Sequence, residues 1–293
     1  LAEIMDEAGV PPGVFNLVNG DGRIVGEAIS RHPGIDMVSF TGSTRAGIQI
    51  SKSAADTVKR VVNELGGKSA NIILDDADFE SAIKSAVANC FFINGQACDA
   101  GTRLFVPRAR LEETVKLAAA AAEENVVGPP SDPQTTLGPV MNANQFERVQ
   151  QLIQTGIDEG ARLVCGGTGR PKGVEAGYFV KPTVFADVKP NMTIYREEIF
   201  GPVLSITEYE DLSDAVRMAN DTEYGLAAHV TGKNMDAVRQ VARQLRAGSV
   251  FVNSPDWDPK APFGGYGQSG NGRECGAHGF TEYLEIKAVV GHG

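Results

Sequence analysis

The 293-residue sequence predicts an α/β fold built on a parallel sheet. Two observations carry this prediction. Short apolar runs typical of buried strands alternate with helical segments, which is the pattern of βαβ units. Hydrophobic residues make up 42% of the chain and charged residues 22%, which is ordinary for a globular protein with a buried core. The length is enough for two domains.

In the first third, apolar runs and helical segments follow one another. We expect strands at 14–18, 34–43 and 58–64, and helical segments after the glycine-rich turn at 19–22 and at 44–56. The middle third repeats the theme. Asp78 is placed to cap the helix that follows a buried strand. The elements expected here are strands from 69, 102 and 161, and helices at 79–92, 111–125 and 143–160.

The last third continues the alternation and ends in a glycine-rich loop and an exposed segment. We expect strands in 178–185, 197–211, 226–232 and 248–254, helices near 211–220 and 234–246, and a loop at 261–274. Residues 280–291 alternate as an exposed strand would. A terminal edge strand often pairs with another chain, so this segment suggests an oligomer.

Charge and cysteine content exclude several functions. The formal net charge is −10, and no basic block interleaved with aromatics occurs, which argues against nucleic acid and anionic membranes. No apolar run reaches the roughly 18–20 residues of a membrane span. Four cysteines lie far apart without a C-x-x-C pair, so neither a disulfide framework nor a zinc site is expected. Free cysteines indicate a reducing compartment, so we expect a cytoplasmic location. Four scattered histidines have neither metal-ligand nor catalytic-triad spacing.

Cys98 stands where an apolar segment breaks into a loop, in "FFINGQACDAGTR". A free cysteine is most often a small buried hydrophobe. Its flanking glycines, however, allow a ligand to approach the backbone, and backbone N–H groups there can stabilise an oxyanion. Glu64 ends an apolar run just before two glycines. A solvated strand end is the simpler reading, but beside a thiol a carboxylate is a sensible general base for water.

Two further segments carry weaker signals. "FTGSTRAG", residues 40–47, places small and hydroxyl residues at a helix start, which suits a pyrophosphate but equally describes a tight turn. "YREEIFGPV", residues 195–203, pairs Glu197 with Glu198. Neighbouring residues of an extended segment point in opposite directions, so these carboxylates are not expected to share a site.

The order of these motifs is more specific than each alone. "FTGSTRAG", "ELGGKSANIILDDAD", "GQACDAGTR", "EEIFGPV" and "PFGGYGQSGNGRE" closely resemble the aldehyde dehydrogenase superfamily, over essentially all 293 residues. Because Glu64 is present in "ELGGK", the resemblance is to the hydrolytic, NAD(P)-dependent branch. It implies an oxidoreductase that converts a small-molecule aldehyde into a carboxylic acid with NAD or NADP.

The resemblance also implies roles for individual residues. Cys98 matches the nucleophile that forms a thiohemiacetal and then a thioester, and Glu64 matches the base that activates water to hydrolyse it. The family's oxyanion hole uses the backbone N–H of this cysteine. The positions that match cofactor contacts are Gly42, Ser43, Gly47, Leu65, Gly66, Glu198 and Phe200.

By the same resemblance, residues 1–66 are the C-terminal part of a Rossmann-like NAD(P)-binding domain and 67–264 a catalytic domain. Residues 265–293 are a return segment with an oligomerisation strand, as in a homodimer or homotetramer. Residue 1 corresponds to a helix inside the cofactor domain, so we expect a longer parent protein. Gly267 departs from the family, which usually has Lys or Arg there.

Two alternatives stay open. The chain is a truncated, catalytically silent fragment, or it is a thiol esterase in which Cys98 and Glu64 hydrolyse activated esters without a cofactor. NAD binding separates the dehydrogenase from the silent fragment. Ester turnover without NAD would favour the esterase.

Overall fold

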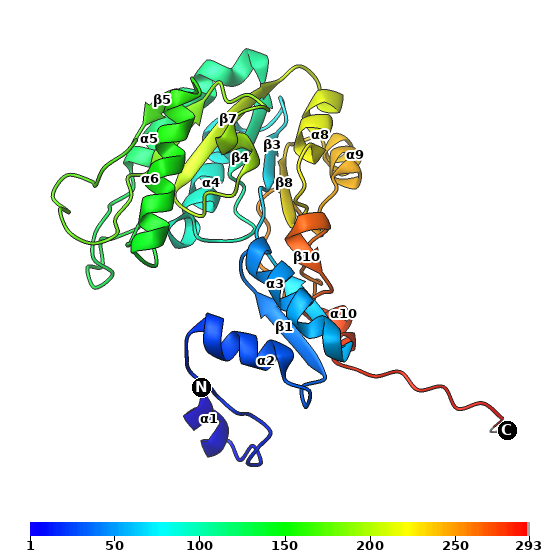
Figure 1. Ribbon diagram of the computed structural model, residues 1–293. Coiled ribbons are helices and arrows are strands. Elements are labelled where there is room, and N and C mark those ends of the chain that lie inside the picture. The colour runs from blue at the N-terminus through cyan, green and yellow to red at the C-terminus, as the bar shows by residue number, and fades with distance from the viewer. Residues whose placement is uncertain (292–293) are drawn as a thin grey trace. The chain divides into compact units, whose positions relative to one another are not determined.

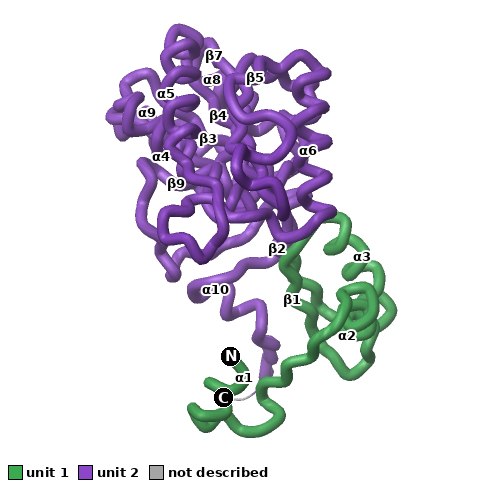
Figure 2. Tube along the Cα trace, turned by 90° about the vertical axis from the view of Figure 1, so that its left-hand side faces the viewer, with its two compact units in different colours: residues 1–63 green, residues 64–293 purple. Residues whose placement is uncertain are grey.

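The computed structural model describes residues 1–291, and the chain divides into two compact units (Figure 2). The first unit comprises residues 1–63 and the second begins at Glu64. The elements of the first unit are α1 (Ala2–Glu7), a π-helical turn (Gly22–Gly26), α2 (Glu27–Arg31), β1 (Met37–Thr41), α3 (Thr44–Ala54) and β2 (Arg60–Glu64), which ends at the boundary between the units.

In the first unit, β1 and β2 are hydrogen-bonded neighbours, and α3 follows β1 directly. Ser43 caps α3, because its Oγ accepts a hydrogen bond from the backbone N–H of Ala46 at 3.3 Å. The strand predicted at 14–18 is wrong: these residues form bends and irregular structure. Val14 and Leu17 are exposed, so the apolar run has no packed neighbour to make it a strand.

The second unit is built on a seven-stranded sheet in the order β5-β6-β7-β4-β3-β8-β9 (Figure 1). All neighbouring strands are parallel except β5, which runs antiparallel to β6 at one edge. The predicted α/β class is confirmed. The strands are β3 (Ala70–Ile73), β4 (Arg103–Pro107), β5 (Arg162–Cys165), β6 (Thr183–Ala186), β7 (Val203–Tyr209), β8 (Ala227–Thr231) and β9 (Ser249–Val252).

Helices cover both faces of this sheet (Figure 1). Successive strand residues point to opposite faces, so Leu104 packs with one cluster of buried side chains and Phe105 with the other. The cluster of Leu104 includes α4 and α5, and that of Phe105 includes α6, α8 and α9. The helices are α4 (Phe79–Phe91), α5 (Leu111–Glu123), α6 (Ala143–Asp158), α7 (Thr193–Arg196), α8 (Leu212–Asn220) and α9 (Met235–Gln244). The inner strands β3, β4, β6 and β7 are buried on both faces, as is typical of parallel sheets, whereas the edge strands β5 and β9 are partly exposed.

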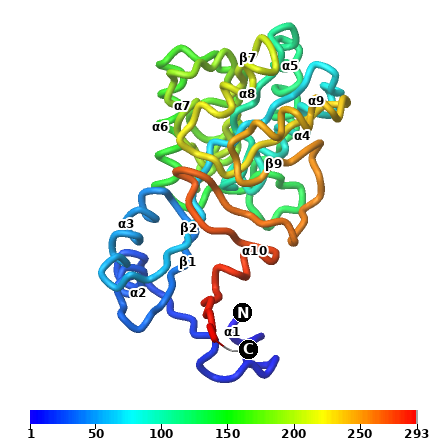
Figure 3. Tube along the Cα trace, turned by 90° about the vertical axis from the view of Figure 1, so that its right-hand side faces the viewer, coloured from blue at the N-terminus to red at the C-terminus, as the bar shows by residue number. Residues whose placement is uncertain are grey.

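Asp78 caps α4 as predicted, because its side chain accepts from the backbone N–H of Ser81. The short strand β10 (Gly270–Asn271) is followed by the helix α10 (Gly276–Thr281), which Figure 3 labels. The rest of the described chain forms no strand. The strand predicted at 280–291 is therefore absent from the single chain. Ile286 and Val290 are exposed there, and a strand needs a neighbour to share its hydrogen bonds. Among the helices of residues 1–291, none has the length and apolar character to cross a membrane.

Candidate active site

The predicted nucleophile and base lie in segments that lead into neighbouring strands of the parallel sheet. Residues 64–69 precede β3, residues 98–102 precede β4, and residues 197–202 precede β7. Because parallel strands begin at the same edge, these three segments meet at one edge of the sheet. Sequence motifs separated by more than 100 residues are thereby brought together.

Cys98 is presented by a sharp break after α4. Ile93 and Asn94 adopt left-handed backbone conformations with φ of 48° and 59°, and Gly95 follows with φ of 71°. This turn ends the helix and sends the chain into the loop. Asn94 fixes the turn, since its Oδ1 accepts from the N–H of Gly138 at 2.6 Å and its Nδ2 donates to the carbonyl of Pro139 at 3.2 Å.

Glycines allow the Cys98 loop to lie against the neighbouring segment. A Cβ added to Gly67 would stand 2.6 Å from the carbonyl oxygen of Cys98, so a side chain there would displace the loop. At the end of the loop, the N–H of Gly101 donates to Oδ1 of Asn89 on α4 at 2.8 Å. The Cys98 thiol itself remains partly accessible.

Glu64 is buried beside Cys98, with only 3% of its surface exposed. Burial raises the pKa of its carboxyl to about 8, and interaction with the Cys98 thiol opposes the shift. Within residues 1–291, neither carboxylate oxygen of Glu64 has a hydrogen-bond partner at full hydrogen-bond geometry. Burial, and next the charge of Glu64, raise the pKa of the Cys98 thiol well above its usual range. The resting pair is therefore a neutral thiol beside a carboxyl that titrates near neutral pH.

Leu65 and Gly66 are held by Ser269 of the glycine-rich loop. The N–H of Leu65 donates to the carbonyl of Ser269 at 3.1 Å, and the Ser269 hydroxyl donates to the carbonyl of Gly66 at 2.7 Å. Ser269 Oγ also accepts from the N–H of Gly225 at 3.0 Å. This fully buried serine joins the loop to the segment that follows the base.

The two carboxylates of "EEIFGPV" do not share a site, as predicted. Glu197 is exposed and pairs with Arg148. Glu198 turns inward, where its Oε1 accepts from the N–H of Gly67 at 3.2 Å. Burial raises the pKa of Glu198, while the Gly67 N–H and the Lys68 ammonium lower it. Phe200 follows in a left-handed conformation with φ of 56°.

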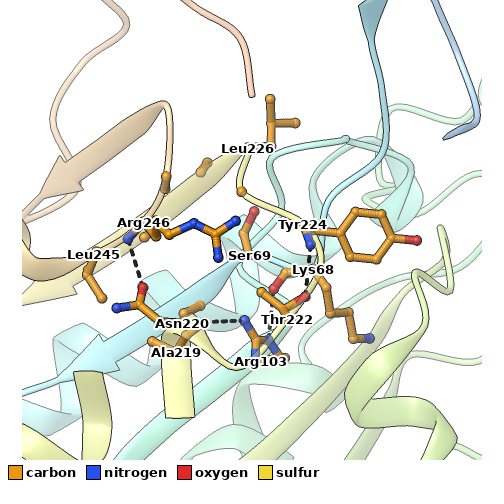
Figure 4. Close-up of a pocket in the computed structure, with 15 residues that line it drawn as sticks. Lys68, Ser69, Arg103, Ala219, Asn220, Thr222, Tyr224, Leu226, Leu245 and Arg246 are labelled. Atoms are coloured by element: carbon orange, nitrogen blue, oxygen red, sulfur yellow. Dashed lines mark hydrogen bonds between the residues drawn. The ribbon is translucent and has the colours of Figure 1, made fainter. Parts of the chain in front are cut away.

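Two positively charged side chains, Lys68 and Arg103, are buried next to the segment that carries Gly67, and the sequence did not predict their burial. Lys68 is 1% exposed, and its Nζ has no hydrogen-bond partner among residues 1–291. Burial, with the charge of Arg103, lowers its pKa to about 7. The Arg103 guanidinium donates to the carbonyls of Lys68, Met218 and Ala219 at 2.8, 3.2 and 2.8 Å. Figure 4 shows both residues beside a cavity of about 20 Å³, room for about one water molecule. Nothing in the sequence marks these positions as buried.

Gly267 lies next to a cation from another element. It has φ of 57°, and a Cβ there would meet the carbonyl oxygen of Glu223 at 2.6 Å, so this backbone favours glycine. The Arg246 guanidinium lies 3.5 Å from the position of that Cβ. Arg246 thus supplies a positive charge close to where the family usually carries its own.

Gly42, Ser43 and Gly47 lie in the first unit, at the junction of β1 with α3. Ser43 is the helix cap described above, and Gly47 is buried in the first turns of α3. A Cβ on Gly42 would meet the Phe40 ring at 2.5 Å. The arrangement is a strand–turn–helix with small residues at the turn, as the motif predicted.

The site combines the Cys98 thiol on its loop, the buried Glu64 carboxyl beside it, and glycines that let the backbone segments approach closely. These are the parts of a site for nucleophilic covalent catalysis. The family follows from comparison with known proteins. The model of the aldehyde dehydrogenase family matches residues 1–289, and the chain belongs to this family.

Similar proteins agree with that assignment. The chain is 55% identical to a 3-succinoylsemialdehyde-pyridine dehydrogenase from Pseudomonas sp over 292 residues, which cover 100% of this chain and 61% of that protein. It is 49% identical to a putative aldehyde dehydrogenase from Staphylococcus saprophyticus, with 100% and 62% covered. The chain therefore spans about three fifths of the length of these curated relatives.

Solved structures show the same fold. Aldehyde dehydrogenase C from Pseudomonas syringae, a cysteine-to-alanine mutant in complex with NAD+ and octanal, is 56% identical with a TM-score of 0.97. The match covers 99% of this chain and 60% of that one. Betaine aldehyde dehydrogenase from Staphylococcus aureus in complex with NAD+ is 38% identical with a TM-score of 0.94, covering 98% and 59%. The predicted aldehyde dehydrogenase fold is confirmed.

Proposed function

We propose that this chain carries the catalytic centre of an NAD- or NADP-dependent aldehyde dehydrogenase, with Cys98 as nucleophile and Glu64 as general base. The observation that supports it most strongly is the buried Glu64 carboxyl beside the Cys98 thiol, with a pKa raised to about 8. A base with a pKa near the operating pH is the effective one. Family membership supports the aldehyde as the substrate class.

In this mechanism the ionised Glu64 accepts the thiol proton, because burial makes the Cys98 thiol a weak acid that needs an adjacent base. The sulfur then bonds to the aldehyde carbon, and the carbonyl oxygen becomes an alkoxide. The backbone N–H of Cys98, which already lowers the pKa of its own thiol, is available to stabilise negative charge there. Loss of hydride from the same carbon leaves a thioester on Cys98. Glu64 first releases the thiol proton to solvent. The ionised carboxylate then takes a proton from the water that attacks the thioester. The carbon–sulfur bond breaks, the acid leaves, and Glu64 returns the proton to the Cys98 sulfur.

The residues present fit a nicotinamide nucleotide. Glu198 uses one oxygen to accept from Gly67, and its remaining lone pairs suit ribose hydroxyls. Gly66 has no side chain in front of that carboxylate. In the first unit, the turn with Gly42 and Ser43 before α3 suits a pyrophosphate. When bound, the nicotinamide ring supplies the acceptor for the hydride.

We extend the proposal to the wider assignments made from sequence. Residues 1–66 would form part of the cofactor-binding domain, residues 67–264 the catalytic domain, and the exposed segment after α10 the strand that pairs with another copy in a homodimer or homotetramer. The exposed Ile286 and Val290 support a partner for that segment. A cytoplasmic location is part of the same proposal.

The test is NADH or NADPH formation by the purified 293-residue chain, with Cys98→Ala as control. Octanal, bound by the Pseudomonas syringae enzyme, and 3-succinoylsemialdehyde-pyridine, named in a relative, are the first aldehydes to try. Reduced cofactor that depends on Cys98 would support the proposal. Equal turnover by Cys98→Ala would refute the nucleophile assignment. A folded chain that forms no reduced cofactor would favour a silent fragment.

An ester substrate tests the second candidate. Cys98 and Glu64 both lie in the second unit, so thiol ester chemistry does not require residues of the first. Cys98-dependent hydrolysis of an activated ester without cofactor, combined with no aldehyde oxidation, would favour the esterase.

A further inference from the structure

We propose that His229 is a positioning residue, which fixes the loop carrying Cys98 by donating a hydrogen bond from its Nε2 to the backbone carbonyl of Asp99. The inference rests on the proposed role of Cys98 as nucleophile. His229 acts on the backbone next to the thiol and does not itself touch the reacting atoms.

The contact joins a strand to the residue directly after the nucleophile. His229 Nε2 lies 3.1 Å from the carbonyl oxygen of Asp99. Because a carbonyl oxygen only accepts, the ring nitrogen must carry the proton. Burial lowers the pKa of His229, so the ring is neutral at pH 7 and its Nε2–H tautomer is the one that makes this bond.

The imidazole is held from both sides of its strand. His229 occupies the middle of β8, and its register partners are Asn71 on β3 and Phe251 on β9. The ring stacks on Phe251, with 5.1 Å between centroids and 21° between planes. On the loop side, a Cβ on Gly101 would meet His229 Cδ2 at 3.1 Å, so the glycine lets the loop close against the ring. A side chain packed in this way is a rigid donor.

His229 and Asn89 hold the same loop at two points. His229 binds the carbonyl of Asp99, and Asn89 on α4 accepts from the N–H of Gly101. Between them, the N–H of Ala100 donates to the carbonyl of Ala97, which closes a turn around Cys98. These contacts restrict rotation of the Ala97–Cys98 peptide and of the Asp99–Ala100 and Ala100–Gly101 peptides that follow the nucleophile. This matters because a nucleophile and its oxyanion donors must keep their geometry to be effective.

Loss of the donor should release the loop and expose the thiol to water. The pKa of Cys98 is raised mainly by burial, so better solvation lowers it and increases the thiolate fraction. One pKa unit corresponds to about tenfold more thiolate at a pH below both values. A released loop should therefore react faster with a small alkylating agent while it catalyses more slowly.

The experiment compares three variants of the 293-residue chain. His229→Phe keeps a ring to stack on Phe251 but removes the donor, and His229→Gln keeps an N–H donor on a side chain of similar reach. His278→Phe, at an exposed histidine of α10, is the matched control. Alkylation of Cys98 by iodoacetamide is followed by mass spectrometry of the peptide that contains it, at a pH near 7.5. Melting temperatures are recorded for each variant.

We expect His229→Phe to be alkylated roughly 3- to 10-fold faster than the parent, with His229→Gln and His278→Phe within about twofold. Faster hydrogen exchange in residues 97–102 of His229→Phe alone should accompany it. Equal alkylation of His229→Phe and the parent, or equal acceleration in His229→Phe and His229→Gln, would overturn the proposal. If His229→Phe does not fold, His229→Met replaces it, since methionine has the length of glutamine without the donor.

These readouts need neither aldehyde nor cofactor, so they stand even if the chain forms no NADH and the proposed function fails. If the chain is active, His229→Phe should lower kcat about tenfold with little change in the KM for aldehyde. His229→Gln should restore most of that loss, which a purely structural role would not predict.

Discussion

The carboxylate of Glu198 rests on the backbone of Gly67, with 3.2 Å between Oε1 and the amide nitrogen. The preceding residue leaves no room for a side chain, since a Cβ on Gly66 would stand 2.1 Å from Glu198 Oε2. The observed position of the Glu198 carboxylate therefore requires a glycine at residue 66. The sequence motifs "ELGGK" and "EEIFGPV" meet at this contact.

Gly66→Ala should therefore weaken cofactor binding by displacing Glu198. Loss of a hydrogen bond to a charged group costs about 1.5–3 kcal/mol, which raises the apparent Kd for NAD roughly 10- to 100-fold. Isothermal titration with NAD measures this directly. Gly138→Ala is the control, because a Cβ there meets only ordinary contacts of 3.6 Å or more. Unchanged NAD affinity in Gly66→Ala would show that Glu198 does not bind the cofactor.

Glu64→Gln should separate the two halves of the reaction. Removing the Glu64 charge, which raises the pKa of the Cys98 thiol, lets the thiol lose its proton to solvent more readily, so the thioester still forms. Without a carboxylate to activate water, its hydrolysis slows by about 100-fold or more. We expect a burst of NADH close to one equivalent of enzyme, followed by slow turnover, in a rapid-mixing experiment. Mass spectrometry should find the acyl group on the peptide with Cys98. A linear time course at the parent's rate would contradict the role of Glu64.

The pKa of Glu64 also predicts how the rate depends on pH. Only the ionised carboxylate accepts a proton, and its pKa is about 8. The rate of thioester hydrolysis should therefore rise with pH and level off above about 8. Single-turnover measurements between pH 6 and 9.5 test this. A flat profile over that range would mean that Glu64 is not the titrating base.

The same group links stability to pH. The pKa of Glu64 is about 8 in the folded chain against 4.5 as the reference value, so the folded state binds the extra proton. Below pH 4.5 the Glu64 carboxyl makes its full contribution to the free energy of unfolding. This contribution is lost as the pH rises to about 8, at ~1.4 kcal/mol per pH unit. Glu64→Gln does not titrate. The free energy of unfolding of the parent chain should therefore fall relative to that of Glu64→Gln between pH 6 and 8. Urea denaturation of both proteins measures this difference.

Arg103 should prove essential to the fold. Its guanidinium satisfies three carbonyls while 1% exposed, and two of these carbonyls end α8. Arg103→Met removes the side-chain donor to the carbonyls of Lys68 and Ala219, at about 1–3 kcal/mol for each group, whereas the carbonyl of Met218 keeps the Tyr195 hydroxyl as a donor. We expect a loss of about 3–5 kcal/mol in urea denaturation. Arg239→Met, which removes an exposed pair with Asp236, should cost no more than about 1 kcal/mol. Similar losses in both variants would disprove the assignment.

Local signals in the sequence predicted most of the fold. The cap at Asp78, the alternation of buried strands with helices, and the loop at Cys98 depend on neighbours along the chain, and the structure contains all three. Residues 14–18 and 280–291 have strand-like composition but no strand beside them. A strand needs a hydrogen-bonding neighbour, which composition does not reveal.

The same limit applies to the site. Cys98 and Glu64 stand in motifs with family-specific order, so the sequence predicts both as site residues. Lys68, Arg103 and His229 owe their roles to burial and to partners more than 30 residues away. In the sequence, these three residues cannot be told from solvent-exposed side chains. The four histidines are scattered, so their spacing does not single out His229.

The segments that carry Glu64, Cys98 and Glu198 lead into strands β3, β4 and β7, so the turns that leave these strands lie at the far edge of the sheet. This separation makes the protein a convenient scaffold for engineering. A purification tag, a fluorescent reporter or a circular-permutation joint introduced near Arg108 or Glu210, where side chains are solvent-exposed, would sit a whole strand length from Cys98. Modified chains of this kind should keep the reactivity of the parent thiol.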